Sequence, residues 1–233
     1  GAGGRAARDA PPATDTAARA PRPRSFHASP PATPPAPADE QAKTLPQHRI
    51  AMDDKGKRTP HGRDMPEMCT HPRLAHMMLS SVKLKQAYHA CLIASLLTDK
   101  DLFLANADKS ADIFDRINIL VQGRFNHHGI DSQQCKRILQ TADDFFRRVK
   151  QCSNSFSNKG KLNKERPDAN YSGVLLAYAY PDRIAKQRNT NQARYLLSNG
   201  KGAVIPPFLQ QHLHEYLVVA NLDAKQGEAC IYL

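Results

Sequence analysis

The chain has 233 residues, 40% of them hydrophobic, and its 33 lysines and arginines stand against 22 acidic residues, a formal net charge of +11. This composition supports a core in one or two domains and favours an anionic partner. No apolar run approaches the roughly 18 residues that a transmembrane helix needs, so we expect no membrane contact.

Residues 1–37 hold nine of the seventeen prolines, and they carry five arginines but only two acids. They lack the periodic apolar positions whose burial could offset the entropy of ordering. We predict that this segment is disordered or is a poorly determined end of the sequence. Because the chain starts at Gly1 and stops at Leu233 inside a predicted strand, we also expect a fragment of a longer protein.

Residues 38–70 have the pattern of a small, degraded domain. A short helix is predicted from 38 to 45, and Pro46 stops it because proline cannot continue a helix. Residues 52–59 predict a hairpin-like turn with Gly56 at its tip.

The stretch 59–99, here called the hub segment, organises the rest of the chain. It begins with a polar turn at residues 59–63, whose proline and glycine should prevent a continuous helix. Pro72 opens a helix, because the missing N–H of a proline costs nothing in the first turn. A second helix is centred on residues 90–97, which are apolar on every side, as in a helix surrounded by other elements.

Two amphipathic helices are predicted after the hub segment. The first spans 111–125 and places these side chains on one face: Ile113, Phe114, Ile117, Leu120, Val121 and Phe125. The second begins behind Asp131 or Ser132, because either residue is a good N-cap. Its apolar positions follow a clean helical period: Cys135, Ile138, Leu139, Ala142, Phe145, Phe146, Val149 and Cys152. Together these helices predict a bundle over residues 71–152.

After the bundle the spacing of apolar residues changes from a helical to a strand-like period. Residues 153–170 are polar and lysine-rich and predict a basic linker, and residues 171–233 predict a β domain. The four predicted strands are 194–197, 202–205, 216–222 and 228–233. The first two flank an Asn-Gly step, which is typical of a tight hairpin turn. Four short strands after a bundle predict a small β-barrel, truncated at its end.

Catalytic motifs are lacking. The sequence has no GxxxxGK[ST] phosphate loop, no Asp-Glu-x-His run, no GxSxG elbow and no Cys-x-x-Cys pair, so we expect no ATP hydrolysis by this chain alone and no catalytic residue. The five cysteines show no close pairing, which is typical of a reducing compartment.

Three groups of residues could be interpreted as metal sites: Cys69 with His71 and His76, His127 with His128, and His212 with His214. His71 and His76 are five positions apart on a predicted helix and therefore lie on different faces. For His61, His71 and His76 we predict ordinary hydrogen bonds at helix ends and turns, and we expect no metal site.

Basic residues are concentrated between positions 145 and 201. Twelve lysines and arginines stand there against three acids, so +9 of the net charge of +11 lies in one quarter of the chain. The following tyrosines are interleaved and could stack on unpaired bases: Tyr171, Tyr178, Tyr180 and Tyr195. The pattern favours a nucleic-acid contact; the alternative is a solvated basic surface with the tyrosines in the core.

Several motifs resemble the region that follows the motor domains in HrpB-type ATP-dependent RNA helicases of the DEAH/RHA group. They are TPHGRDM at 59–65, HPRLAHMML at 71–79, ACLIASLLTDKDLF at 90–103, YPDRIAKQR at 180–188, RYLLSNGKGAVI at 194–205 and EYLVVANLDAKQGEACIYL at 215–233. The resemblance covers about residues 38–233. It implies an α+β fold that is mainly α: a degenerate winged-helix remnant at 38–70, a ratchet-like helical bundle at 71–152, and a truncated OB-like barrel.

The same resemblance implies a bacterial, cytoplasmic parent helicase. Its two RecA-like motor domains would bind ATP and Mg²⁺ and would precede this chain, which holds no cofactor itself. The partners implied are these motor domains and single-stranded RNA, or also DNA. Two other classes stay open, a stand-alone RNA-binding module and a basic protein-interaction scaffold.

The residues chosen as nucleic-acid contacts are Arg183, Lys186 and Arg188, in the family-like PDRIAKQR run, and Lys201, in the barrel turn. Phosphates would be held mainly by such side chains, so binding should depend on salt and little on sequence. Arg63 and Arg73 lie in the most family-like motifs and are interpreted as structural, pairing with helix ends or with Asp64.

Overall fold

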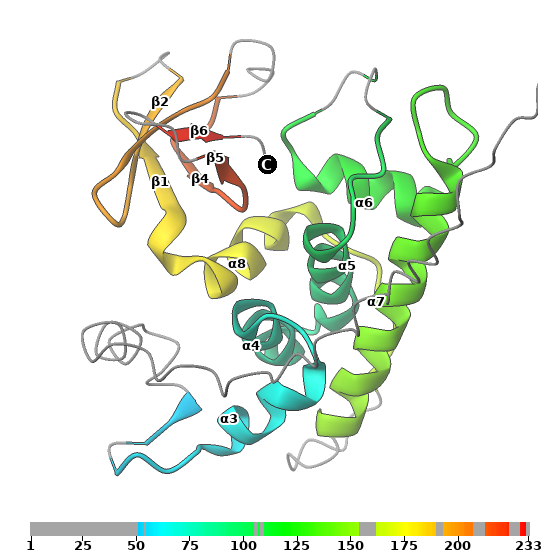
Figure 1. Ribbon diagram of the computed structural model, residues 1–233, viewed down its shortest axis with the longest axis vertical. Helices are drawn as coiled ribbons and strands as arrows, with labels where there is room; N and C mark the ends of the chain where they lie inside the picture. The colour runs from blue at the N-terminus through cyan, green and yellow to red at the C-terminus, as the bar shows by residue number, and fades with distance from the viewer. Residues whose placement is uncertain are drawn as a thin grey trace, which may run out of the picture.

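The computed structural model describes residues 51–53, 55–104, 107, 110–153, 162–189, 193–206, 213–223 and 229–231. The predictions for residues 1–50, disorder over 1–37 among them, lie outside the described residues. A group of helices and a small β-sheet make up the described part, and helix α8 (Ala169–Ala179) lies between them (Figure 1). None of the described helices combines the length and the apolar character that crossing a bilayer requires.

The hub segment begins with a short helix where a turn was predicted. In α3 (Pro60–Asp64) the Thr59 hydroxyl accepts a hydrogen bond from the Gly62 N–H at 3.0 Å, and Pro60 occupies the first position, where no N–H is needed. The prediction of a non-helical turn is therefore wrong, because a capped proline can start one turn of helix. A 3₁₀ turn, η1 (Met65–Met68), follows and ends at Cys69.

Gly62 is the point where α3 meets the residues before it. The predicted hairpin-like turn is confirmed: Met52 and Arg58 form an antiparallel bridge, and Gly56 has a φ of +73°. The Thr59 N–H donates to the Ala51 carbonyl oxygen at 2.9 Å, and a Cβ added to Gly62 would lie 2.0 Å from that same oxygen. The contact thus has room only for glycine.

We expect Gly62→Ala to lower the free energy of unfolding by about 1–3 kcal/mol, because backbone atoms would have to move to admit the methyl group. Chemical denaturation followed by circular dichroism measures this loss. Gly173→Ala is the matched control, because a Cβ there meets nothing within 4 Å and the residue lies in the exposed part of α8. It should stabilise the chain by about 0.5–1 kcal/mol, as alanine does in helices. Equal effects of the two substitutions would contradict the packing described here.

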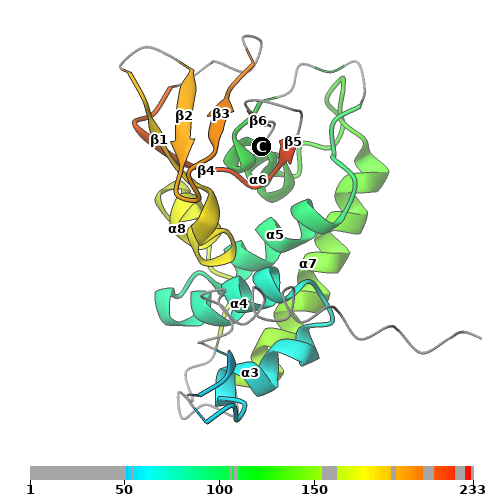
Figure 2. The same ribbon diagram turned by 60° about the vertical axis from the view of Figure 1, so that its left-hand side comes forward.

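Helix α5 (Ala87–Thr98) is the centre of the helical part, as the apolar sequence predicts. Residues 90–96 are all buried, and the helix packs on α4 (Pro72–Ser81) and on the long helix α7 (Ser132–Ser153). A 3₁₀ turn, η2 (Val82–Leu84), separates α4 from α5. Figure 2 shows α5 running between these helices and the sheet.

The two predicted amphipathic helices are present, and the first is shorter than expected. Helix α6 (Ile113–Gln122) is capped by Asp112, whose carboxylate accepts from the Phe114 N–H at 2.8 Å, and it ends at Gly123 with a φ of +66°. Val121 is 43% exposed, so its predicted place on the buried face is wrong.

Helix α7 confirms its predicted start and apolar face. The Asp131 carboxylate accepts from the backbone N–H groups of Gln133 and Gln134, at 2.9 and 3.0 Å. Of the eight predicted apolar positions, seven are buried and Leu139 is half-buried. The clean helical period of this sequence therefore identified the face that packs on the core.

Helix α8 was not predicted as a helix. Its sequence is apolar without a marked period, and all of it from residue 171 onward falls in the predicted β domain. Asp168 caps it by accepting from the Asn170 N–H at 3.0 Å, and Leu175, Leu176 and Ala179 are buried in the same core as α5. The helical core thus extends beyond the predicted linker and into the range expected to be β.

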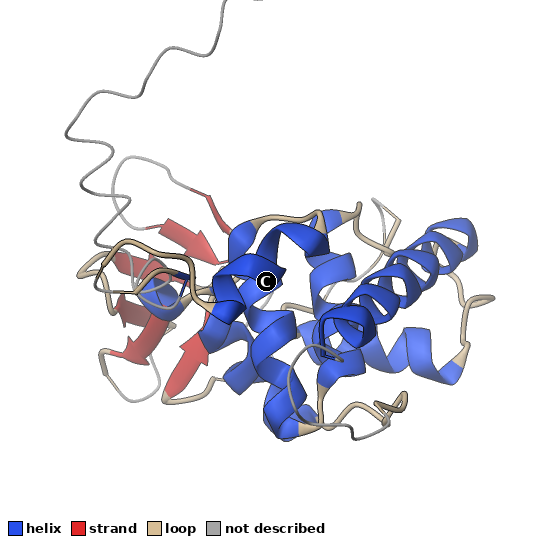
Figure 3. Ribbon diagram, turned by 90° about the horizontal axis from the view of Figure 1, so that it is seen from below, coloured by secondary structure: helices blue, strands red, loops and turns tan. Residues whose placement is uncertain are grey.

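The sheet has six strands in the order β4-β1-β2-β3-β6-β5 instead of the four predicted. They are β1 (Ile184–Gln187), β2 (Arg194–Leu197), β3 (Gly202–Val204), β4 (Tyr216–Val218), β5 (Leu222–Asp223) and β6 (Ala229–Ile231). All neighbouring strands are antiparallel except β3 and β6, which are parallel. Figure 3 shows the strands on one side of the molecule and most helices on the other.

Two strand predictions need correction and one is confirmed. Strand β1, which follows a 3₁₀ turn, η3 (Pro181–Arg183), is not among the four predicted strands, and the predicted strand 216–222 is divided between β4 and β5. The hairpin between β2 and β3 is confirmed, with Gly200 at a φ of +82°. Strands β4 and β5 form the two edges of the sheet although they are consecutive in the chain, and no pairing joins them among the residues described, so the sheet is open there.

Candidate nucleic-acid interface

The structure places Arg183 at a junction between the helical part and the sheet. Its guanidinium donates to the Ala220 carbonyl oxygen at 2.7 Å and lies 4.8 Å from the centroid of the Tyr180 ring. Its backbone carbonyl also accepts from the Val219 N–H at 3.1 Å. These bonds give Arg183 a structural role that the sequence did not indicate, because it was selected only as a phosphate contact.

Arg73 completes this junction from the other side. It forms an ion pair with Asp182, whose Oδ1 lies 2.5 Å from its Nη1, and Nη1 also approaches the Ala179 carbonyl at the end of α8 at 3.5 Å. The Arg73 guanidinium lies 5.5 Å from the Tyr180 centroid, so that two guanidinium groups contact one ring. Burial raises the pKa of Tyr180. The interpretation of Arg73 as a structural residue at a helix end is confirmed.

The sheet has a buried side and an exposed side, as alternation along each strand requires. Four side chains of the first three strands are buried: Ala185, Tyr195, Leu197 and Ala203. The residues that alternate with them form what we call the outer face: Ile184, Lys186, Arg194 and Leu196, with Tyr216 from β4. Register joins three strands in a row, because Tyr216 is opposite Lys186 and Lys186 is opposite Leu196.

The remaining predicted contacts lie at opposite ends of this sheet. Arg188 is exposed just after β1, where its N–H donates to the Arg194 carbonyl at 2.9 Å. Lys201 is exposed in the β2–β3 turn, where its N–H donates to the Asn199 side chain at 3.0 Å. Lys186 lies between them on the outer face, 3.9 Å from Glu215. Basic side chains therefore extend along the sheet and do not form one cluster.

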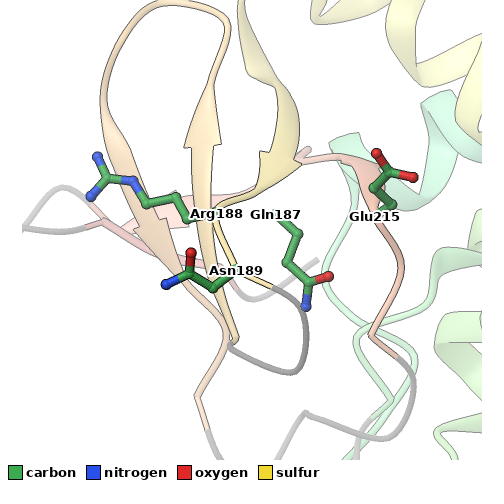
Figure 4. Close-up of a pocket in the computed structure, with 4 residues that line it drawn as sticks. All are labelled: Gln187, Arg188, Asn189 and Glu215. Atoms are coloured by element: carbon green, nitrogen blue, oxygen red, sulfur yellow. The ribbon is translucent and has the colours of Figure 1, made fainter.

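A polar pocket of about 550 Å³ lies at the Arg188 end of the sheet. It is lined by Gln187, Arg188, Asn189 and Glu215, and Figure 4 shows these side chains spread around it instead of converging on one point. Amide, guanidinium and carboxylate groups can all bond to base edges. Their arrangement does not resemble a catalytic constellation.

The tyrosines proposed for stacking have different environments. Tyr195 is fully buried, and its hydroxyl donates to the His214 carbonyl at 3.0 Å, so its predicted stacking role is wrong. Tyr180 is half-buried, and the guanidinium groups of Arg73 and Arg183 both lie against its ring. Tyr178 is 36% exposed on α8, whereas Tyr216, which was not singled out, is 56% exposed on the outer face. Strand alternation in EYLVV could have indicated Tyr216, but only the register shows which residues lie beside it.

Two histidines of the hub segment, His61 and His76, bond to each other. His61 Nε2 lies 2.8 Å from His76 Nδ1, and desolvation lowers the pKa of both rings, that of His76 to about 4. In the part of the chain described here, no group of three histidine, cysteine, aspartate or glutamate side chains is placed to hold a metal ion. His212 lies outside the described residues.

Comparison with solved structures finds a match over most of this chain. The chain is similar to the crystal structure of the Escherichia coli DExH-box NTPase HrpB, with 25% sequence identity and a TM-score of 0.61 over 85% of its length. A second crystal structure, of the Escherichia coli DEAH/RHA helicase HrpB, matches with 24% identity and a TM-score of 0.56 over 86%. This chain spans only 21% and 22% of those two chains.

No protein-family model matches the chain, and no curated protein sequence matches it. The resemblance to HrpB-type helicases that the motifs indicated is nevertheless confirmed by the structural match. The chain is therefore similar to a helicase-related accessory region that makes up about one fifth of the solved proteins.

Proposed function

We propose that this chain is an accessory region of an ATP-dependent helicase and that it holds single-stranded nucleic acid beside the motor. The observation that carries the proposal is the match of 85% of the chain to HrpB. In this proposal ATP and Mg²⁺ bind to RecA-like motor domains outside the chain, and the chain contributes binding without a cofactor. Motor motion would then move the strand past a surface that contacts mainly its phosphates.

The sheet topology supports an OB-like barrel as the finer fold. Strands β1, β2 and β3 form an antiparallel meander, β3 is parallel to β6, and residues 216–223 supply both β4 beside β1 and β5 beside β6. A five-stranded, partly open Greek-key barrel has this order when β4 and β5 are counted as one strand. Such barrels bind oligonucleotides, which is consistent with the basic side chains Lys186, Arg188 and Lys201 on this part of the chain.

We expect the chain to bind labelled single-stranded RNA with an affinity that falls as salt rises. If about four to six phosphates are neutralised, the slope of log K against log[salt] should be near −3 to −4. Arg188→Gln and Lys201→Gln should each reduce the size of the slope by about 0.7 for the phosphate contact that is lost. Fluorescence anisotropy across a salt series measures both quantities.

Arg147→Gln is the matched control, because it removes an exposed arginine of α7 that pairs with Asp144. It should leave the slope nearly unchanged. Absence of RNA binding at low salt, by a chain that circular dichroism shows to be folded, would overturn the proposal. Equal binding to duplex and single-stranded RNA would overturn its single-strand part.

A further inference from the structure

The outer face of the sheet exposes three large apolar side chains to solvent. Ile184, Leu196 and Tyr216 are 38%, 42% and 56% exposed, and they come from three adjacent strands. Isolated exposed apolar residues are normal, whereas several of them on one face indicate a binding surface. With strands about 4.8 Å apart, Tyr216 and Leu196 lie about 10 Å apart across the sheet.

The charges around this group are mainly positive. Lys186 lies inside the row, with its ammonium 5.4 Å from the centroid of the Tyr216 ring. Arg194 is exposed on the same side of β2, and Arg188 follows β1 beside it. The acidic side chain described next to the row is Glu215, 3.9 Å from Lys186. A hydrogen bond to the Tyr216 side chain and the nearby Glu215 carboxylate raise the pKa of Lys186, so its ammonium stays charged.

This combination suits an unpaired nucleotide. A nucleobase offers an apolar π-face that stacks on an aromatic ring or an aliphatic side chain, and the attached phosphate is an anion. A protein partner that covered the same apolar group would have to desolvate the Lys186 ammonium in the middle of the contact. The charges therefore favour single-stranded nucleic acid as the occupant.

We infer that the outer face of β4, β1 and β2 is a stacking platform for unpaired bases, with Tyr216 as its aromatic ring and Lys186 and Arg194 as its phosphate contacts. This inference rests on the proposed function and deepens it. It assigns the base contact to Tyr216 and not to the tyrosines that precede it in the sequence. A base stacked on the Tyr216 ring would have its phosphate close to Lys186, whose ammonium lies 5.4 Å from the ring centroid.

Stacking and phosphate contact have different signatures, so one experiment can separate them. Tyr216→Ala should weaken binding of oligo(rU) by about tenfold or more, because stacking of one base is worth about 1–3 kcal/mol. The salt slope should not change, because no charge is removed. Tyr216→Phe should bind like the parent chain, and Tyr178→Ala, which removes an exposed tyrosine of α8, is the matched control and should also have no effect.

An abasic oligonucleotide of the same length tests the base directly. It should bind the parent chain about as weakly as oligo(rU) binds the Tyr216→Ala variant. Because the chain contains no tryptophan, Tyr216→Trp introduces a single such fluorophore, and oligo(rU) should quench it while the abasic strand should not. Each of these results would support the platform.

Two results would overturn the platform, and a third would contradict the proposed function on which it rests. Equal affinity of the parent chain for oligo(rU) and the abasic strand would overturn the platform while leaving the proposed phosphate contact in place. A Tyr216→Trp variant that binds oligo(rU) without quenching of its tryptophan fluorescence would also overturn the platform. The exposed apolar side chains of the outer face would then be assigned to contact with a protein partner. Absence of binding to either strand would instead contradict the proposed function itself.

Discussion

Between pH 7 and pH 5 the buried imidazoles of His76 and His89 should together lower the free energy of unfolding by about 4 kcal/mol, about 2 kcal/mol each. His76 and His89 are 5% and 1% exposed, and desolvation by burial lowers the pKa of each ring from 6.5 to about 4. The unfolded chain takes up protons as the pH falls below 6.5, while the folded chain keeps both rings neutral until about pH 4. Unfolding is therefore accompanied by proton uptake in this window, and stability falls as the pH falls.

The surroundings of the two rings explain why they stay neutral. The Ser172 hydroxyl lies 3.1 Å from His89 Nε2 and the Gln86 side-chain oxygen 3.2 Å from Nδ1, so α8 and the start of α5 both depend on this ring. Asp168 favours the charged form of His89 but does not outweigh its burial. His76 contacts His61, and the proximity of His61 lowers the pKa of His76 further.

Urea denaturation at pH 7 and pH 5, followed by circular dichroism, measures the loss. His89→Leu should reduce the difference between the two pH values by about 2 kcal/mol, even if the variant is less stable at both. His127→Leu is the matched control, because this imidazole lies exposed in the loop before α7, and the variant should keep the full difference. If His89→Leu keeps it as well, the buried imidazole is not the source of the pH dependence.

Arg73→Ala should lower the free energy of unfolding by about 2–3 kcal/mol, because it removes one partner of a partly buried ion pair. The Arg73 and Asp182 side chains are 17% and 34% exposed, and the pair joins α4 to the turn that starts the sheet. The variant leaves the Asp182 carboxylate without this guanidinium, although Arg183 still lies 4.0 Å from it. It also removes one of the two cations beside the Tyr180 ring.

A double-mutant cycle with Asp182→Ala measures the interaction itself, and we expect a coupling energy of about 1–2 kcal/mol. The pair of Arg147 and Asp144 is the matched control, because its side chains are 70% and 58% exposed. Its coupling should stay below about 0.5 kcal/mol, as exposed helix pairs do. Similar couplings for the two pairs would mean that the Arg73 ion pair does not hold the helical part to the sheet.

Several elements could be predicted from the sequence because their signals are local. The apolar stripe of α7 repeats over many turns, so its buried face was identified almost completely. The Asn-Gly step at 199–200 predicted the β2–β3 hairpin, in which Gly200 adopts a positive φ and the Asn199 side chain accepts from the Lys201 N–H. Residues 90–97 are apolar on every side, which predicted a central helix before any neighbour was known.

Other elements could not be predicted because their signals are tertiary. Helix α8 has apolar residues around its whole circumference, and length alone did not separate it from buried strands. Strand β1 has only four residues, and its pairing with both β2 and β4 is a long-range property. The sequence shows the charge of Arg183 and therefore predicted a phosphate contact. It does not show that the Arg183 guanidinium donates a hydrogen bond to the Ala220 carbonyl oxygen.

The sequence by itself determined the helical core, one hairpin, the excess of basic over acidic residues and the resemblance to HrpB-type helicases. The spacing of apolar residues, the turn residues and the motifs that carry these predictions are all formed by residues close together in the chain. Only the tertiary structure decided which charged and aromatic side chains are available to a partner. Strand register placed Tyr216 beside Lys186 and buried Tyr195 behind them, although both tyrosines lie in similar apolar runs. Exposure depends on which strands pair, and pairing is decided by contacts between distant parts of the chain.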